Sequence, residues 1–94
     1  MTNPISIEDI QDDAIADAIG CVRFTCAMLI KLEKKRDAGR GGWNHPYQCS
    51  VGHLRKMLSE HVPKCDMVDI ANFAMMIWNR EHLDGELRDE EVQP

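Results

Sequence analysis

The sequence predicts an all-α protein, with one long helix followed by an antiparallel helix pair, and three observations lead to this prediction. Apolar residues recur at helical steps through three segments, glycine and proline cluster between those segments, and no segment alternates like a strand. The chain has 94 residues, of which 44% are hydrophobic and 29% charged, so it suits a single soluble domain, which we place at residues 1–83. A chain this short buries a modest core, and we expect dimerisation to complete the helices into a bundle.

The first predicted helix spans residues 7–37. Ser6 is a good N-cap. Gly20 marks either a close helix crossing or a break. Basic residues 34–36 complement the helix dipole, and Gly39 ends the helix. One apolar stripe, predicted to face the core, recurs at steps of four and three through Ile15, Ile19, Val22, Cys26, Leu29 and Leu32.

Two shorter helices follow. Ser50 caps the second helix, which Pro63 ends, and Asp66 caps the third. The third helix has apolar residues around most of its circumference, so we expect it to be buried in the middle of a bundle or at a dimer interface. Residues 84–94 are acidic and lack a period, which predicts a disordered tail.

Charge and hydropathy exclude several classes of function. No apolar run approaches the ~18–20 residues that cross a bilayer, and the acidic start lacks the pattern of a signal segment, so we expect a cytoplasmic protein that binds no membrane. The net charge of −5 argues against an extended nucleic-acid surface. Residues 31–64 nevertheless carry eight basic residues against three acidic ones. This basic middle either binds an anion or reflects the ordinary charge patterning of helices.

Three carboxylates converge on one end of the predicted helix pair. Glu60 lies near the end of the second helix, while Asp66 and Asp69 open the third helix one turn apart. Mg²⁺ prefers such clustered carboxylates, especially with substrate phosphates, so the three residues are candidate metal ligands. The alternative is structural, with Asp66 as a cap and Asp69 satisfying the helix N-terminus.

Cys49, His53, His61 and Cys65 are ligand types that zinc accepts. On a straight helix the two cysteines would lie more than ~20 Å apart at ~1.5 Å per residue, so one zinc ion cannot collect all four residues. A zinc site shared between two chains is one alternative. In the other, His61 is a partly buried polar residue and Cys65 fills a turn.

Basic and aromatic residues gather at the end of the first helix and in the glycine-rich loop after it. Cations there can hold a polyphosphate and a ring can stack on a base, but a solvated helix face beside an anchored loop explains the same residues. Trp43 therefore either anchors the loop or lines a nucleotide pocket. The group comprises Lys31, Lys34, Lys35, Arg36, Arg40, Trp43, His45 and Tyr47.

Two segments resemble small phage-encoded MazG-like proteins. Residues 31–43 read KLEKKRDAGRGGW and are similar to the K-L-x-K-x-x-x-K-G-G-W type segment of that family. Residues 66–77 read DMVDIANFAMMI and are similar to its E-x-x-D-V-A-N-F-A-M-M-I helix. Between them, SVGHLRKMLSEHVPK takes the place of the helix that carries E-E-x-x-E. The resemblance covers about residues 24–80 and implies an all-α fold.

The resemblance also implies dimers that hydrolyse nucleoside triphosphates with Mg²⁺ held by the motif carboxylates. Glu60 matches the first glutamate of E-E-x-x-E, but His61 and Lys64 stand in place of the other two. Two of five carboxylates are therefore lost, and Lys64 opposes a cation by Coulomb repulsion. In the E-x-x-D-V-A-N motif, Asp66 replaces the glutamate. Asp69 matches the aspartate of that motif, and Asn72 matches its asparagine.

We therefore expect a nucleotide-binding protein whose pyrophosphohydrolase activity is weakened or lost. If the protein is active, Glu60 is the catalytic candidate, and Glu60, Asp66 and Asp69 hold Mg²⁺ while an activated water attacks the phosphate chain. The alternative is a small phage helical interaction protein that binds and inhibits a host defence or metabolic protein in the host cytoplasm. The substrate-binding candidates are Lys31, Lys34, Lys35, Arg40, Trp43, His61, Lys64 and Asn72.

Overall fold

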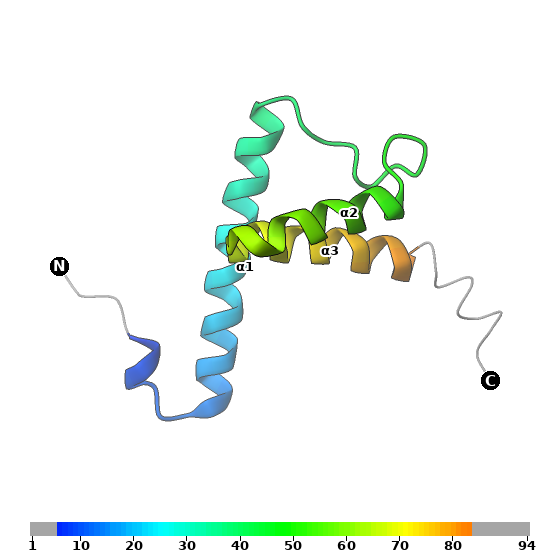
Figure 1. The fold of residues 1–94 in the computed structure, drawn as a ribbon. Coiled ribbons are helices and arrows are strands. Elements are labelled where there is room, and N and C mark those ends of the chain that lie inside the picture. Colours follow the sequence, from blue (N-terminus) through cyan, green and yellow to red (C-terminus); the bar gives the residue numbers. More distant parts are fainter. Residues whose placement is uncertain (1–5, 84–94) are drawn as a thin grey trace, which may run out of the picture.

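The structure, a computed structural model, describes residues 6–83, and the predicted tail at 84–94 lies outside them. Its elements are η1 (Ile7–Asp9), α1 (Asp13–Asp37), α2 (Val51–His61), η2 (Val62–Lys64) and α3 (Met67–Leu83). Every regular element over this range is helical, which confirms the all-α prediction. Helices α2 and α3 lie side by side in opposite directions, and α1 crosses the pair where α2 ends and α3 begins (Figure 1). No helix within residues 6–83 is long and apolar enough to cross a membrane.

The first helix begins later than the sequence predicted. Ser6 caps only the short helix η1, and its hydroxyl accepts a hydrogen bond from the amide of Glu8. Helix α1 starts at Asp13, because the Asp12 carboxylate accepts the amide of Ile15 at 3.2 Å and provides a second N-cap. The predicted helix 7–37 is therefore interrupted before Asp13.

The other predicted helix ends are confirmed. Gly39 ends α1 in the left-handed region at φ 84°, and Ser50 Oγ accepts the amide of His53 at 3.0 Å. Pro63 lies in η2, and Cys65 then takes a left-handed conformation at φ 59°. Asp66 Oδ1 accepts two amides at the start of α3. These local signals set where the chain turns and thus bring the start of α3 back against α1.

A small apolar core joins α2 to α3. Among the described residues, only Leu54, Met76 and Ile77 are buried apolar side chains. Partly buried residues pack around them, and these include Leu32 of α1 and Trp43 of the loop. Trp78 is 57% exposed, so one part of the apolar surface of α3 is not covered by the described residues. Only two sides of α3 are covered, one by α2 and one by α1.

Apart from Leu32, the apolar stripe of α1 lies outside this core. Ile15, Val22 and Leu29 are 51%, 62% and 59% exposed, whereas the sequence predicted them in the core. Lys31 and Lys35 lie on the other side of the helix and are the residues that reach α3. The N-terminal half of α1 projects away from the helix pair (Figure 1), and its stripe residues Ile15 and Val22 are exposed.

Candidate functional site

A pocket of about 710 Å³ lies between the end of α1, the loop over residues 38–50 and the α2–α3 pair. Three of the side chains that line it, Lys35, Arg36 and Arg40, are cationic. None of its described lining residues is acidic, although the whole chain carries a net charge of −5. Its apolar and aromatic lining includes Leu32, Trp43, Leu54, Met57, Phe73 and Met76.

The loop that forms one wall of the pocket is shaped by two glycines. Gly39 and Gly42 have φ values of 84° and 87°, a region that other residues rarely adopt. Backbone hydrogen bonds then hold the following segment in turns. The amide of His45 donates to the Gly42 oxygen at 3.0 Å, and the amide of Cys49 donates to the His45 oxygen at 2.9 Å. The loop therefore has a defined path from α1 to α2.

Arg80 ties this loop to α3. Its side chain is only 6% exposed, and Nη1 donates to the backbone oxygens of Trp43 at 2.8 Å and Cys49 at 2.7 Å. The sequence reasoning missed Arg80. A signal existed, because Arg80 follows Asn72 and Met76 at steps of four and so belongs to the buried stripe of α3.

Trp43 packs on the helix bundle and also lines the pocket. Its side chain packs against the core cluster, and its backbone oxygen is held by Arg80. The same residue lines the pocket. Anchor and pocket wall are therefore not alternatives in this arrangement.

The predicted metal ligands of α3 are paired with lysines of α1. Lys31 Nζ lies 2.5 Å from Asp66 Oδ2 and 3.1 Å from Asp69 Oδ2. Lys35 Nζ lies 3.2 Å from Asp69 Oδ1, although this oxygen accepts no hydrogen bond of good geometry, so we regard the contact as ionic. The hydrogen bond from Lys31 lowers the pKa of the Asp66 carboxyl, and the same bond raises the pKa of Lys31.

These residues do not fit a Mg²⁺ ion as they stand. Glu60 is exposed on α2 and makes no ion pair among the described residues. Over residues 6–83 no three His, Cys, Asp or Glu side chains gather as a metal site would require. The two remaining carboxylates are already paired with ammonium groups. The four residues of the zinc set are likewise not gathered into one group within residues 6–83.

The structure separates the predicted substrate-binding residues into two groups. Lys35, Arg40, Trp43 and His61 line the pocket, and so does Arg36 of the same basic and aromatic group. His53 and Phe73, which the sequence did not place in the nucleotide site, line it as well. The ring of His61 lies 4.8 Å from that of Phe73, and His61 Nδ1 lies 2.8 Å from the Met57 oxygen. The other four predicted residues, Lys31, Lys34, Lys64 and Asn72, do not line the pocket.

Asn72 has a packing role between α3 and α1. It is 3% exposed, and its Nδ2 donates to the backbone oxygen of Met28 at 3.4 Å. Its Oδ1 is buried without a hydrogen-bond partner. Lys34 and Lys64 are exposed on α1 and η2.

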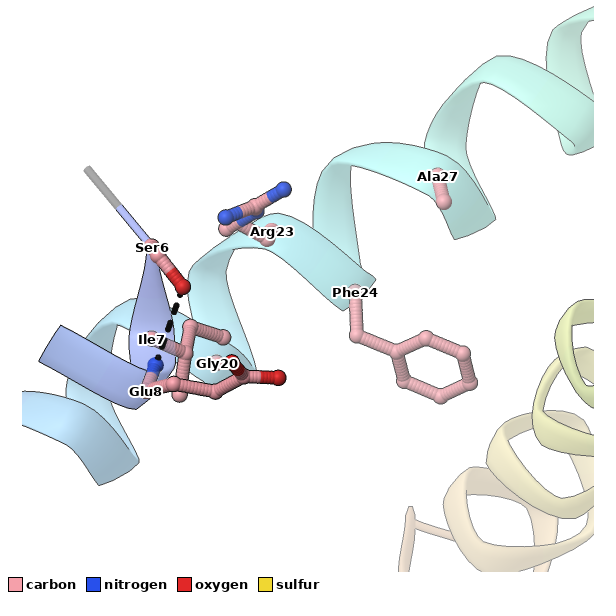
Figure 2. A pocket seen from close by; sticks show the side chains of 7 residues that line it. All are labelled: Ser6, Ile7, Glu8, Gly20, Arg23, Phe24 and Ala27. Atoms are coloured by element: carbon pink, nitrogen blue, oxygen red, sulfur yellow. Dashed lines mark hydrogen bonds between the residues drawn. The ribbon is translucent and has the colours of Figure 1, made fainter. Parts of the chain in front are cut away.

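A second pocket, of about 590 Å³, lies where η1 folds against α1. Ile7 reaches toward Gly20, whose added Cβ would meet Ile7 at 4.0 Å, an ordinary contact distance (Figure 2). This pocket is lined by one acid, Glu8, and one base, Arg23, and by none of the predicted site residues. This second pocket therefore lacks the excess of positive charge that the lining of the pocket beside the loop carries.

Comparisons of the chain with models of protein families, with curated proteins and with solved structures gave no match.

Proposed function

We propose that this protein binds a nucleotide in the pocket beside the loop, and that any pyrophosphohydrolase activity is weak or lost. The observation that supports the proposal is the pocket lining, which holds three cationic side chains and no acidic one in an acidic chain. Guanidinium groups pair well with phosphate oxygens, so Arg36 and Arg40 are suited to the phosphate chain. The apolar and aromatic part of the lining, with Trp43 and Phe73, is suited to a base.

The proposed weakness of catalysis follows from the carboxylates. Asp66 and Asp69 are paired with Lys31 and Lys35, so neither is free to act on a water or a metal in this arrangement. Glu60, the proposed catalytic residue, belongs to no group of three His, Cys, Asp or Glu side chains that could hold a metal among the described residues. The family reaction implied by the sequence resemblance is therefore proposed here only as an ancestral one.

Thermal shift with ATP, deoxynucleoside triphosphates and inorganic triphosphate tests the nucleotide pocket. A ligand at about 100 times its Kd stabilises the native state by ~2.7 kcal/mol, which would raise the melting temperature clearly. Arg40→Gln should remove most of the shift. Lys34→Gln removes the same charge from an exposed position away from the pocket and should keep it. No shift with any of these compounds would refute the proposal.

A second candidate function, assembly through α1, is favoured by the exposed stripe. We propose that a second copy of this chain covers it and that the protein is a homodimer. The stripe of Ile15, Ile19, Val22, Cys26 and Leu29 has the alternating steps of four and three at which paired helices meet. Exposed apolar patches of this extent mark interaction sites on soluble proteins.

Charge complementarity favours an antiparallel pair of identical helices. Helix α1 has Asp13 and Asp17 near its start and Lys34, Lys35 and Arg36 in its last turn. Two antiparallel copies place the acidic start of each helix toward the basic end of the other. In such a pair the middle residue of the stripe, Val22, faces its own counterpart at the two-fold axis.

Sedimentation velocity tests the dimer. Val22→Glu would place two carboxylates together at the axis and should produce monomers. Cys21→Glu adds the same charge at an exposed neighbouring position about 100° round the helix and should leave the dimer intact. A monomeric wild type at tens of micromolar would refute the second copy as occupant and would favour the alternative, a host protein on the same stripe.

A further inference from the structure

Both carboxylates that open α3 are engaged by protein groups. Asp66 Oδ1 accepts the amides of Val68 and Asp69 at 3.1 Å each, and its Oδ2 binds Lys31. Asp69 Oδ2 binds the same ammonium at 3.1 Å, and its Oδ1 faces Lys35 at 3.2 Å. Three of the four carboxylate oxygens therefore bind an amide or an ammonium group, the fourth, Asp69 Oδ1, has only the ionic contact with Lys35, and the two negative charges are matched by two positive ones.

Lys31 occupies the position that a cation shared by these carboxylates would need. Its Nζ contacts Oδ2 of both residues, so a divalent ion bridging Asp66 and Asp69 would have to displace it. Mg²⁺ also demands near-octahedral oxygen geometry at about 2.0–2.1 Å, which a pair of oxygens held by ammonium groups does not offer. Lys64, two residues before Asp66, adds a further positive charge to this end of the helix pair.

Lys35 links this cluster to the pocket. It lies beside Asp69 and also lines the pocket, and its Nζ is 5.6 Å from the centre of the Phe73 ring. A lysine so placed holds a positive charge at the pocket wall without any ion. Arg36 and Arg40 supply further positive charge to the same lining.

We infer that Lys31 and Lys35 take the place of a divalent cation at the start of α3, and that the pocket binds its anionic ligand without metal. The second half rests on the nucleotide pocket proposed above, whereas the first half concerns the carboxylates alone. The ammonium groups neutralise Asp66 and Asp69 and fasten α1 to α3. Lys35 brings an ammonium group, paired with Asp69, to the pocket wall, and Arg36 and Arg40 supply the positive charge for phosphate.

Mn²⁺ binding followed by electron paramagnetic resonance, with no nucleotide present, tests the first half. The wild type should leave Mn²⁺ free up to roughly 1 mM, the range of weak hard-cation sites. Lys31→Met frees both Oδ2 atoms and removes one positive charge, so it should bind Mn²⁺ on the order of tenfold tighter or more. Lys34→Met makes the same change on the neighbouring exposed face and should bind no more Mn²⁺ than the wild type.

The outcomes of this experiment separate the two halves. Micromolar Mn²⁺ binding by the wild type that Asp69→Asn abolishes would overturn the inference, and so would the absence of any gain in Lys31→Met. In a second arm, the thermal shift with ATP should be the same in EDTA as in Mg²⁺. A shift that requires Mg²⁺ would overturn metal-free binding, while no shift in either buffer would refute the nucleotide pocket and leave the Mn²⁺ result standing.

Discussion

Replacing Arg80 with methionine should release the loop over residues 38–50 and destabilise the protein strongly. The buried guanidinium donates two short bonds, to the backbone oxygens of Trp43 and Cys49. Hydrogen bonds that involve a charged group contribute about 1.5–3 kcal/mol each, so the loss is at least ~3 kcal/mol. This is a large share of the ~5–15 kcal/mol that stabilises a typical domain. Methionine keeps the aliphatic bulk, so the change reports mainly on the polar contacts.

Thermal unfolding followed by circular dichroism measures this loss. For a domain of 60–100 residues 1 kcal/mol corresponds to about 4–8 °C, so Arg80→Met should melt at least ~12 °C lower. The matched control is Arg55→Met, because Arg55 is 58% exposed and pairs with Glu81 at the surface. Exposed pairs contribute at most ~1 kcal/mol, so the control should change little.

Tryptophan fluorescence separates loop release from a general loss of stability. The chain has two tryptophans, and Trp78→Phe leaves Trp43 as the only reporter. In that background Arg80→Met should shift the Trp43 emission to longer wavelength well below the melting temperature, as the loop leaves the core cluster. Equal melting temperatures for Arg80→Met and Arg55→Met, with an unchanged emission, would show that Arg80 does not hold the loop.

Three further predictions follow from the packing and the ion pairs. Leu54→Ala should lower the free energy of unfolding by about 2–5 kcal/mol in urea titrations because Leu54 is 2% exposed, whereas Met67→Ala, at an exposed position, should change it little. The folded-state pKa of Asp66 is lowered, so its pairing with Lys31 stabilises the protein above the ordinary value of 3.8 and is lost as the pH falls through the lowered value. Asp66→Asn removes the charge but keeps a capping side chain. Its melting temperature should differ from that of the wild type at neutral pH, and the two should converge as the pH falls below 3.8. A difference that stays constant with pH would show that the ion pair does not stabilise the protein. Trp43→Ala should lower both the melting temperature and the ATP-induced shift, and loss of one alone would assign Trp43 to a single role.

The helix ends were predictable because the groups that decide them are neighbours in the chain. Ser50 and Asp66 accept amides within three residues, and Pro63 restricts the backbone of the residue before it, so spacing alone located these helix ends. The start of the first helix was misplaced because the chain offers two caps there. Both Ser6 and Asp12 are good caps, and the choice between them depends on how η1 folds back on α1.

The candidate site was predictable only in part. Lys35, Arg40 and Trp43 follow one another closely enough in sequence to suggest a shared surface, and they do line one pocket. The partners from distant segments were not visible, because nothing in the sequence says which face of α1 meets α3. The sequence had offered Lys31 as a substrate-binding residue and Asp66 as a metal ligand. The packing of α1 on α3 instead joins them in one ion pair.

The sequence by itself determined three helices, their caps and a glycine-rich loop that carries a tryptophan, because these depend on short-range hydrogen bonds and backbone preferences. Only the tertiary structure decided that the apolar stripe of α1 points outward while Lys31 and Lys35 point inward. An amphipathic helix offers both faces to its neighbours, and the acidic start of α3 selects the basic one. The stripe around Val22 is then left exposed.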